Sequence, residues 1–159
     1  MEKSLTASYD PQRPVALPKT LGILRRGLGD PTIRLSQTEA WLAFPTPLGD
    51  ATLHIHKPFA SSPAALQAWG PGAQWAIEQL PRLCGAHDDP EGFDGTRHPL
   101  IADIHHRHPD IRLGATDLVF DDLASAIFEQ KVTGLQAFGA WRAIVTWYGE
   151  RAPGPTPRP

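Results

Sequence analysis

The histidines are the first residues to consider in this sequence, because their spacing could suggest a metal site. His98, His105 and His108 fall within one expected short helix, and His54 and His56 alternate along one expected strand. Helical zinc sites usually place two histidines four residues apart with a third ligand nearby, and neither group has that arrangement. We therefore expect solvated histidines, and the sequence indicates no metal and no cofactor.

Two other candidates for chemistry are also weak. Cys84 is the single cysteine, so the 159 residues form no internal disulfide. A lone cysteine is most often a small buried hydrophobe, and it fits a reducing cytoplasm. The stretch Gly27–Pro31 is rich in glycine, but no strand precedes it and Pro31 lacks an amide donor. It therefore does not predict a phosphate-binding loop.

A small sheet is expected in the first third of the chain. Apolar residues alternate over residues 32–36 and 51–57, and residues 40–44 are typical of a strand between them. Tight turns join these segments, which predicts an antiparallel meander covered on one face by a helix. Residues 1–16 are expected to form one short strand or an arm, and residues 17–26 a short helix.

Helical patterns dominate after Pro58. The expected helices cover residues 63–69, 73–84 with a kink or break near Pro81, 98–108, 117–130 and 135–148. The last two carry apolar stripes, from Phe120 to Ile127 and from Phe138 to Tyr148.

Strands followed by helices predict an α+β fold, a small antiparallel sheet with a covering helix and then an incomplete all-α part. We divide the chain into an N-terminal β domain (1–60), a covering helix and linking loop (61–97), the first helices of a helical domain (98–150) and a proline-rich end (151–159). The last segment, RAPGPTPRP, cannot continue a helix and is typical of a linker.

The stretch from His108 to Glu150 carries the most specific pattern. Three short sequence motifs occur in order: HPDIRL at 108–113, AIFEQKVT at 126–133 and YGE at 148–150. In this order, and with these helix lengths, they resemble the start of the helical domain of the DNA-3-methyladenine glycosylase II family. That family belongs to the helix-hairpin-helix DNA glycosylase superfamily, and it also places a small antiparallel β domain before these helices.

The resemblance implies base-excision repair, with hydrolysis of the N-glycosidic bond of alkylated purines in double-stranded DNA and no cofactor. Such an enzyme extrudes its target nucleotide, and a side chain inserted into the gap offsets the cost of unstacking. In the family that side chain directly follows the glutamine, which puts Lys131 in this role after Gln130. The family pattern has an apolar residue there, whereas a lysine fills a gap with its methylenes and offers an ammonium to the orphaned base or a phosphate.

Gln130 and Thr133 complete the expected DNA-binding set. Gln130 is expected to hydrogen-bond the backbone or the opposite strand. Thr133 also fits the N-cap of the next helix. Taken from the residues alone, Lys131 is also explained as a surface lysine on a helix-to-helix turn, and both interpretations stay open.

The residues that would perform the chemistry are not in this sequence. The family grips a phosphate with a Gly-rich hairpin and uses an aspartate shortly after it, and no such hairpin occurs in the 159 residues. Asp121, Asp122 and Glu129 precede the hairpin's place, so we assign no catalytic residue. We expect an N-terminal fragment that is inactive alone. The alternative is a non-catalytic α+β interaction module or a functionless truncated remnant.

Composition sets the remaining expectations. The chain is 41% hydrophobic and 20% charged, which favours a packed core over disorder. Its formal net charge is -2, so overall charge gives no reason to expect nucleic-acid binding. The family's hairpin binds phosphate largely through main-chain dipoles, which weakens this objection. No run approaches the roughly 18 apolar residues of a membrane span, so no membrane partner and a cytoplasmic location are expected.

Overall fold

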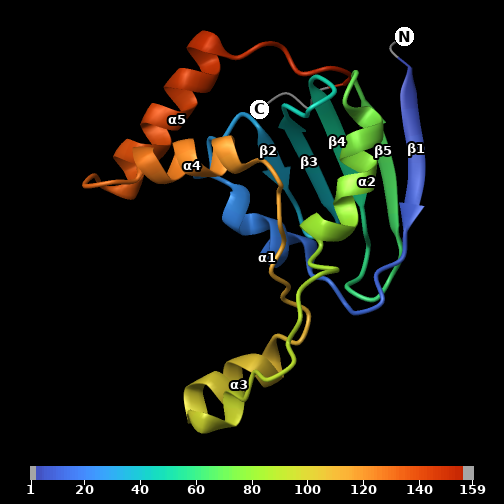
Figure 1. Cartoon of the computed structure of the whole chain (residues 1–159), viewed down its shortest axis with the longest axis vertical. Helices are drawn as coiled ribbons and strands as arrows, with labels where there is room; N and C mark the ends of the chain where they lie inside the picture. Colours follow the sequence, from blue (N-terminus) through green and yellow to red (C-terminus); the bar gives the residue numbers. More distant parts are fainter. Residues whose placement is uncertain (1–2, 156–159) are drawn as a thin grey trace.

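The computed structural model describes residues 3–155 and has an α+β fold, as expected (Figure 1). Its described strands form one antiparallel sheet in the order β1-β5-β4-β3-β2. The strands are β1 (Ser4–Tyr9), β2 (Ile33–Leu35), β3 (Glu39–Phe44), β4 (Ala51–His56) and β5 (Ala64–Trp69). The meander predicted from the alternating residues is therefore confirmed for β2, β3 and β4, and the N-terminal segment is a strand.

One face of the sheet forms the hydrophobic core. Leu53 and Ile55 of β4 are completely buried, as their alternation predicted. Helix α2 (Ala73–Leu83) covers this face over β4 and β5, and α1 (Leu17–Leu21) closes it near β2 and β3 (Figure 1). Burying such side chains removes apolar surface from water, at about 25 cal/mol per Å², and this burial drives the unit together.

The helix expected over residues 63–69 is wrong, because this segment is β5. Ala64, Leu66 and Ala68 alternate into the core, while Ala65 and Gln67 face the other way. β5 pairs with β1 on one side and β4 on the other, so two ladders satisfy its backbone. Tertiary pairing decided the conformation of a short segment with an ambiguous local pattern. The division at residue 60 remains a prediction about domains, but the sheet itself continues to Trp69.

Two helix expectations change in detail. The first helix ends at Leu21 and passes into a 3-10 turn, η1 (Gly22–Leu24), instead of reaching residue 26. Helix α2 runs through Pro81 to Leu83 without a break.

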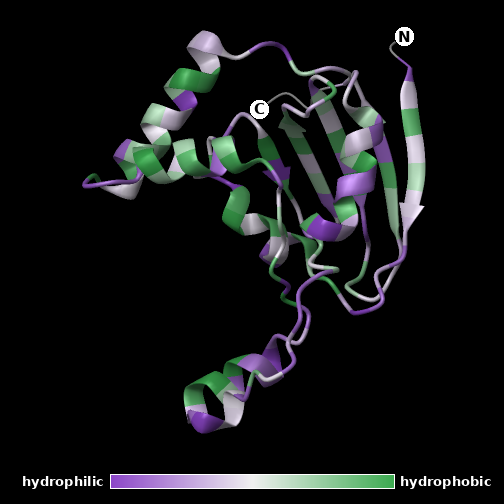
Figure 2. Cartoon of the chain, viewed as in Figure 1, coloured by the Kyte–Doolittle hydropathy of each residue, from purple (hydrophilic) through white to green (hydrophobic). Residues whose placement is uncertain are grey.

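The sheet together with α1 and α2 is called the sheet unit, and the later helices lie outside it. A 3-10 turn, η2 (Gly95–Arg97), and α3 (Pro99–Arg107) form an arm at the bottom of Figure 1. Helices α4 (Val119–Phe128) and α5 (Gly134–Tyr148) meet at the far left of that view. Figure 2 shows apolar residues along both helices. Most of these are exposed: Phe120 and Leu123 on α4 are 80% and 56% exposed, and Leu135 on α5 is 85% exposed.

Candidate nucleic-acid interface

Lys131 lies at the turn between α4 and α5, where the chain changes direction. Helix α4 ends at Phe128, and α5 begins at Gly134. Lys131 has a φ of 57°, in the left-handed region that residues other than glycine seldom adopt. Such a residue reverses the chain within a short loop. The strained position is therefore the one at which the sequence predicts an inserted side chain.

Thr133 starts α5 with a capping box. Its hydroxyl accepts from the amide of Gln136 at 3.4 Å, and the Gln136 side chain accepts from the Thr133 amide at 2.9 Å. The hydroxyl of Thr133 also donates to Gln136 Oε1 at 3.0 Å. The N-cap role predicted for Thr133 is confirmed. Such a cap is worth about 1 kcal/mol and fixes where the loop ends.

Gln130, Lys131 and Thr133 lie together on this loop, and all three are exposed. The Gln130 amide donates to the carbonyl of Ile127 at 3.2 Å, which closes the last turn of α4. Within residues 3–155, the side chains of Gln130 and Lys131 have no hydrogen-bond or ion-pair partner. Both are therefore available to an external ligand at the tip of the molecule (Figure 1).

A buried carboxylate, Asp30, ties the loop after α1 to α5. Asp30 is 6% exposed and accepts from the amides of Arg26 at 2.8 Å and Thr32 at 2.9 Å. It also accepts from the Thr32 hydroxyl at 2.7 Å and from Nε1 of Trp141 at 3.3 Å. A buried charge needs such partners, since water no longer solvates it.

Arg26 extends this connection to α4. Its guanidinium lies 4.3 Å from the ring centre of Trp141, within cation–π range. Its Nε donates to the hydroxyl of Ser125, and Nη2 lies 3.9 Å from Asp122. One arginine from the loop thus contacts both helices of the junction. We call Asp30, Arg26 and Trp141 the anchoring network.

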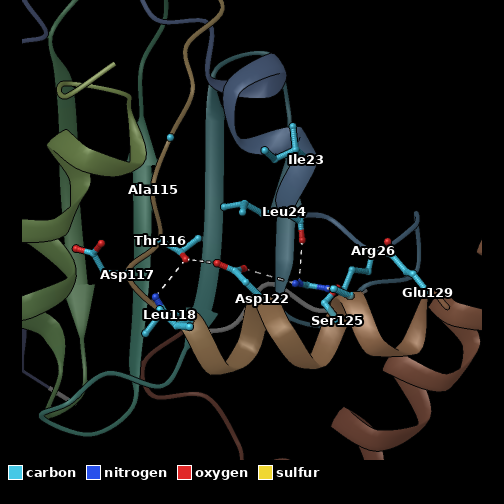
Figure 3. Close-up of a pocket in the computed structure, with 13 residues that line it drawn as sticks. Ile23, Leu24, Arg26, Ala115, Thr116, Asp117, Leu118, Asp122, Ser125 and Glu129 are labelled. Carbon is cyan, nitrogen blue, oxygen red and sulfur yellow. Dashed lines mark hydrogen bonds and ion pairs between the residues drawn. The ribbon is translucent and has the colours of Figure 1, made fainter. Parts of the chain in front are cut away.

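An open pocket of about 450 Å³ lies between η1, residues 114–118 and α4 (Figure 3). Its polar residues include Arg26, Thr116, Asp122 and Glu129. Asp122 accepts from the Thr116 hydroxyl and lies within ion-pair distance of Arg26. Both contacts engage the Asp122 carboxylate within the chain.

The acid next to Asp122 in the sequence is Asp121. Burial raises the pKa of Asp121, and the adjacent Asp122 raises it further, while Arg26 acts in the opposite direction. Asp121 does not line the pocket of Figure 3. No geometry here gives Asp121, Asp122 or Glu129 a catalytic role, and the absence of a catalytic residue remains a prediction.

Other candidate residues have structural surroundings. The described residues contain no group of three or more side chains that could hold a metal ion. His98 caps α3 by accepting from the amide of Leu100 at 3.2 Å, and His108 lies 3.1 Å from the amine of Lys19. Cys84 is 2% exposed, and burial raises the pKa of its thiol to about 12, so it is not a ready nucleophile.

The anchoring network was missed by sequence reasoning. Asp30 lies in the GLGDP stretch, whose glycines suggest a phosphate loop before they suggest a buried acid. An acid in a turn of glycines and prolines, next to arginine, is a signal for a structured turn. Its partner Trp141 is 111 residues away, and no local pattern predicts that pairing.

In the described part of the chain, no helix combines the length and apolarity needed to cross a membrane. The cytoplasmic location stays a prediction.

Comparison with known proteins gives a fold likeness. No protein-family model matches the chain, and no curated protein matches it. The solved structure of a 3-methyladenine DNA-glycosylase from Archaeoglobus fulgidus is similar, with a TM-score of 0.68 at 14% sequence identity. The match covers 93% of this chain and 55% of that one, so this chain spans about half the length of the similar structure.

Proposed function

We propose that this chain is the sheet and first helices of a DNA glycosylase that removes alkylated purines, with the α4–α5 junction as its DNA-contacting element. The observation that carries the proposal is the exposed, unpaired Lys131 at a left-handed turn directly after Gln130. Support comes from the fold likeness to a 3-methyladenine DNA-glycosylase.

Lys131 is suited to occupy the gap left by an extruded nucleotide. Its four methylenes have the bulk to fill part of the stack, and its ammonium can reach the orphaned base or a phosphate. Because no described side chain pairs with it, insertion requires no contact to be broken. Gln130 beside it offers both a donor and an acceptor to the opposite strand.

The junction is also held in place. The anchoring network contacts α4 through Ser125 and α5 through Trp141. A wedge must resist the force of base restacking, so a side chain on a supported turn is more effective than one on a mobile loop.

Residues 1–159 alone are not expected to hydrolyse the glycosidic bond. One carboxylate of the pocket, Asp122, is engaged by Thr116 and Arg26. Hydrolysis needs a carboxylate positioned at the sugar, and geometry comes before pKa. Incubation with alkylated duplex DNA should release no 3-methyladenine above a no-protein control.

The test of the wedge uses a glycosylase that carries this junction together with the remaining helices of the fold. Base extrusion is followed by the fluorescence of 2-aminopurine at the target site. Lys131→Ala should weaken extrusion by roughly 1–3 kcal/mol, comparable to the unstacking cost, and Lys131→Leu should restore much of it. The exposed Lys3 provides the control, Lys3→Ala, which should change nothing.

A phosphate contact would give another pattern. Lys131→Leu would then extrude the base as poorly as Lys131→Ala. In both variants the salt dependence of DNA binding would fall by about one charge. Equal extrusion and equal salt slopes for Lys, Leu and Ala would remove Lys131 from the DNA interface.

A second candidate is a non-catalytic interaction module. The exposed apolar side chains of α4 and α5 favour it, since such surfaces often bind other proteins. A module of this kind would show no preference for DNA with an extrudable base, which separates it from the proposal above.

A further inference from the structure

The sheet face turned away from α2 carries three stacked rings. Trp41 of β3 stacks on His54 of β4, with centres 4.0 Å apart and planes at 18°. Trp41 also stacks on Trp69 of β5, at 5.7 Å and 12°. We call Trp41, His54 and Trp69 the aromatic face.

Burial differs between the two ends of this side of the sheet. Trp69 and Thr52, paired across β5 and β4, are only 5% and 2% exposed, although neither belongs to the core cluster. At the other end the paired residues His56 and Ala65 are exposed. Another part of the chain must therefore cover the end of the sheet at which Trp69 and Thr52 lie.

The segment after α5 provides this cover. It runs from the end of α5 back to the sheet (Figure 1). A Cβ added to Gly154 would overlap Cγ of Trp69 and lie 2.7 Å from its Cδ2. A Cβ added to Gly70 would lie 2.5 Å from Cγ of Pro153. The proline ring thus rests on one glycine, and the backbone of the other rests on the indole.

Both glycines also have a backbone that only glycine adopts easily. The φ of Gly70 is 93° and that of Gly154 is 75°. The fit therefore depends on two glycines, Gly70 directly after β5 and Gly154 in the segment that covers this end of the sheet.

We propose that Trp69, at one end of the aromatic face, is a docking site for a proline-rich segment, and that residues 151–155 of this chain, the strap, occupy it. Proline-rich segments dock on aromatic side chains because they are already extended and lose little entropy on binding. Prolines stand at positions 153, 155, 157 and 159.

The strap gives α5 a second attachment to the sheet unit. Trp141 of α5 is held by Asp30, and the strap fixes the chain beyond Tyr148. The strap therefore adds to the contacts that α5 already makes with residues 26–30. This inference does not depend on a DNA-related function.

The experiment is hydroxyl-radical footprinting of the full chain, with oxidation at each tryptophan read by mass spectrometry. Gly154→Val should expel the strap and raise oxidation of Trp69 several-fold. Gly92→Val is the matched control, because Gly92 has a similar φ of 83° but nothing within 4 Å of an added Cβ. Trp147, 74% exposed, should be oxidised equally in all three proteins.

A peptide tests the chemistry of the partner. The nonapeptide RAPGPTPRP, added to Gly154→Val, should restore protection of Trp69, and the same peptide with alanines for prolines should not. Unchanged oxidation of Leu66 in the core shows that the variant is folded. Full protection of Trp69 in Gly154→Val, or equal protection by the two peptides, overturns the proposal.

Discussion

The sheet unit and the α4–α5 pair are held by different forces. The largest fully buried side chains, Leu21, Leu53, Ile55 and Leu80, all lie in the sheet unit. Beyond Cys84, Ala137 is the only apolar residue of the described chain that is buried. The sheet unit is thus held by apolar burial, whereas the helix pair is attached through a charged and aromatic network.

This difference separates stability from placement. Apolar burial is not directional, so it stabilises the sheet unit without fixing fine geometry. Hydrogen bonds and ring contacts are directional, so the anchoring network sets where the junction lies. Substitutions should therefore affect the free energy of unfolding in the first region and the position of the helices in the second.

The largest effect is expected in the sheet. Leu53→Ala removes a completely buried side chain and should lower the free energy of unfolding by about 2–5 kcal/mol. Leu123→Ala, on the exposed side of α4, should change it by less than about 0.5 kcal/mol. Urea unfolding followed by circular dichroism measures both. Similar losses would mean that α4 belongs to the same core.

A smaller effect is expected in the anchoring network. Asp30→Ala leaves the donors of Arg26, Thr32 and Trp141 without their acceptor, at a cost of about 1–3 kcal/mol. Trp141 should also become more accessible to acrylamide quenching. Asp122→Ala is the control, since Asp122 is half exposed and 3.9 Å from Arg26, and should cost less than about 1 kcal/mol. If the two variants quench alike, Asp30 does not place α5.

The smallest effect on unfolding is expected on the exposed helix face. The double variant Phe120→Ser, Leu123→Ser should leave the free energy of unfolding nearly unchanged, because both side chains are more than half exposed. It should reduce self-association, which a contiguous apolar surface promotes. Light scattering during size exclusion compares it with the parent chain. A parent that is monodisperse and monomeric would show that these faces do not drive association.

The sequence predicted what depends on local pattern. The alternation of Leu53 and Ile55, the cap at Thr133 and both junction helices follow from period and capping chemistry, and the structure has them. Residues 63–69 were predicted as helix because a short Ala-rich segment after proline has no distinctive period. Their pairing with β1 and β4 is a long-range property.

In the candidate interface too, residues close in sequence could be predicted and contacts between distant residues could not. Gln130, Lys131 and Thr133 are consecutive or nearly so, which allowed them to be found together. Asp30 and Trp141, and the contact between Gly154 and Trp69, join residues far apart in the chain. Only the folded arrangement reveals them.

The most direct test of the central claim asks whether Lys131 enters DNA at an extruded position. Duplex DNA with one natural abasic site is mixed with the chain and sodium cyanoborohydride, which reduces any imine formed between a lysine amine and the abasic aldehyde. Peptide mapping then locates the adduct. We expect an adduct on Lys131 that disappears in Lys131→Ala and persists in Lys3→Ala. An adduct spread over Lys3 and Lys19, or unchanged by loss of Lys131, would contradict the assignment of the α4–α5 junction to DNA.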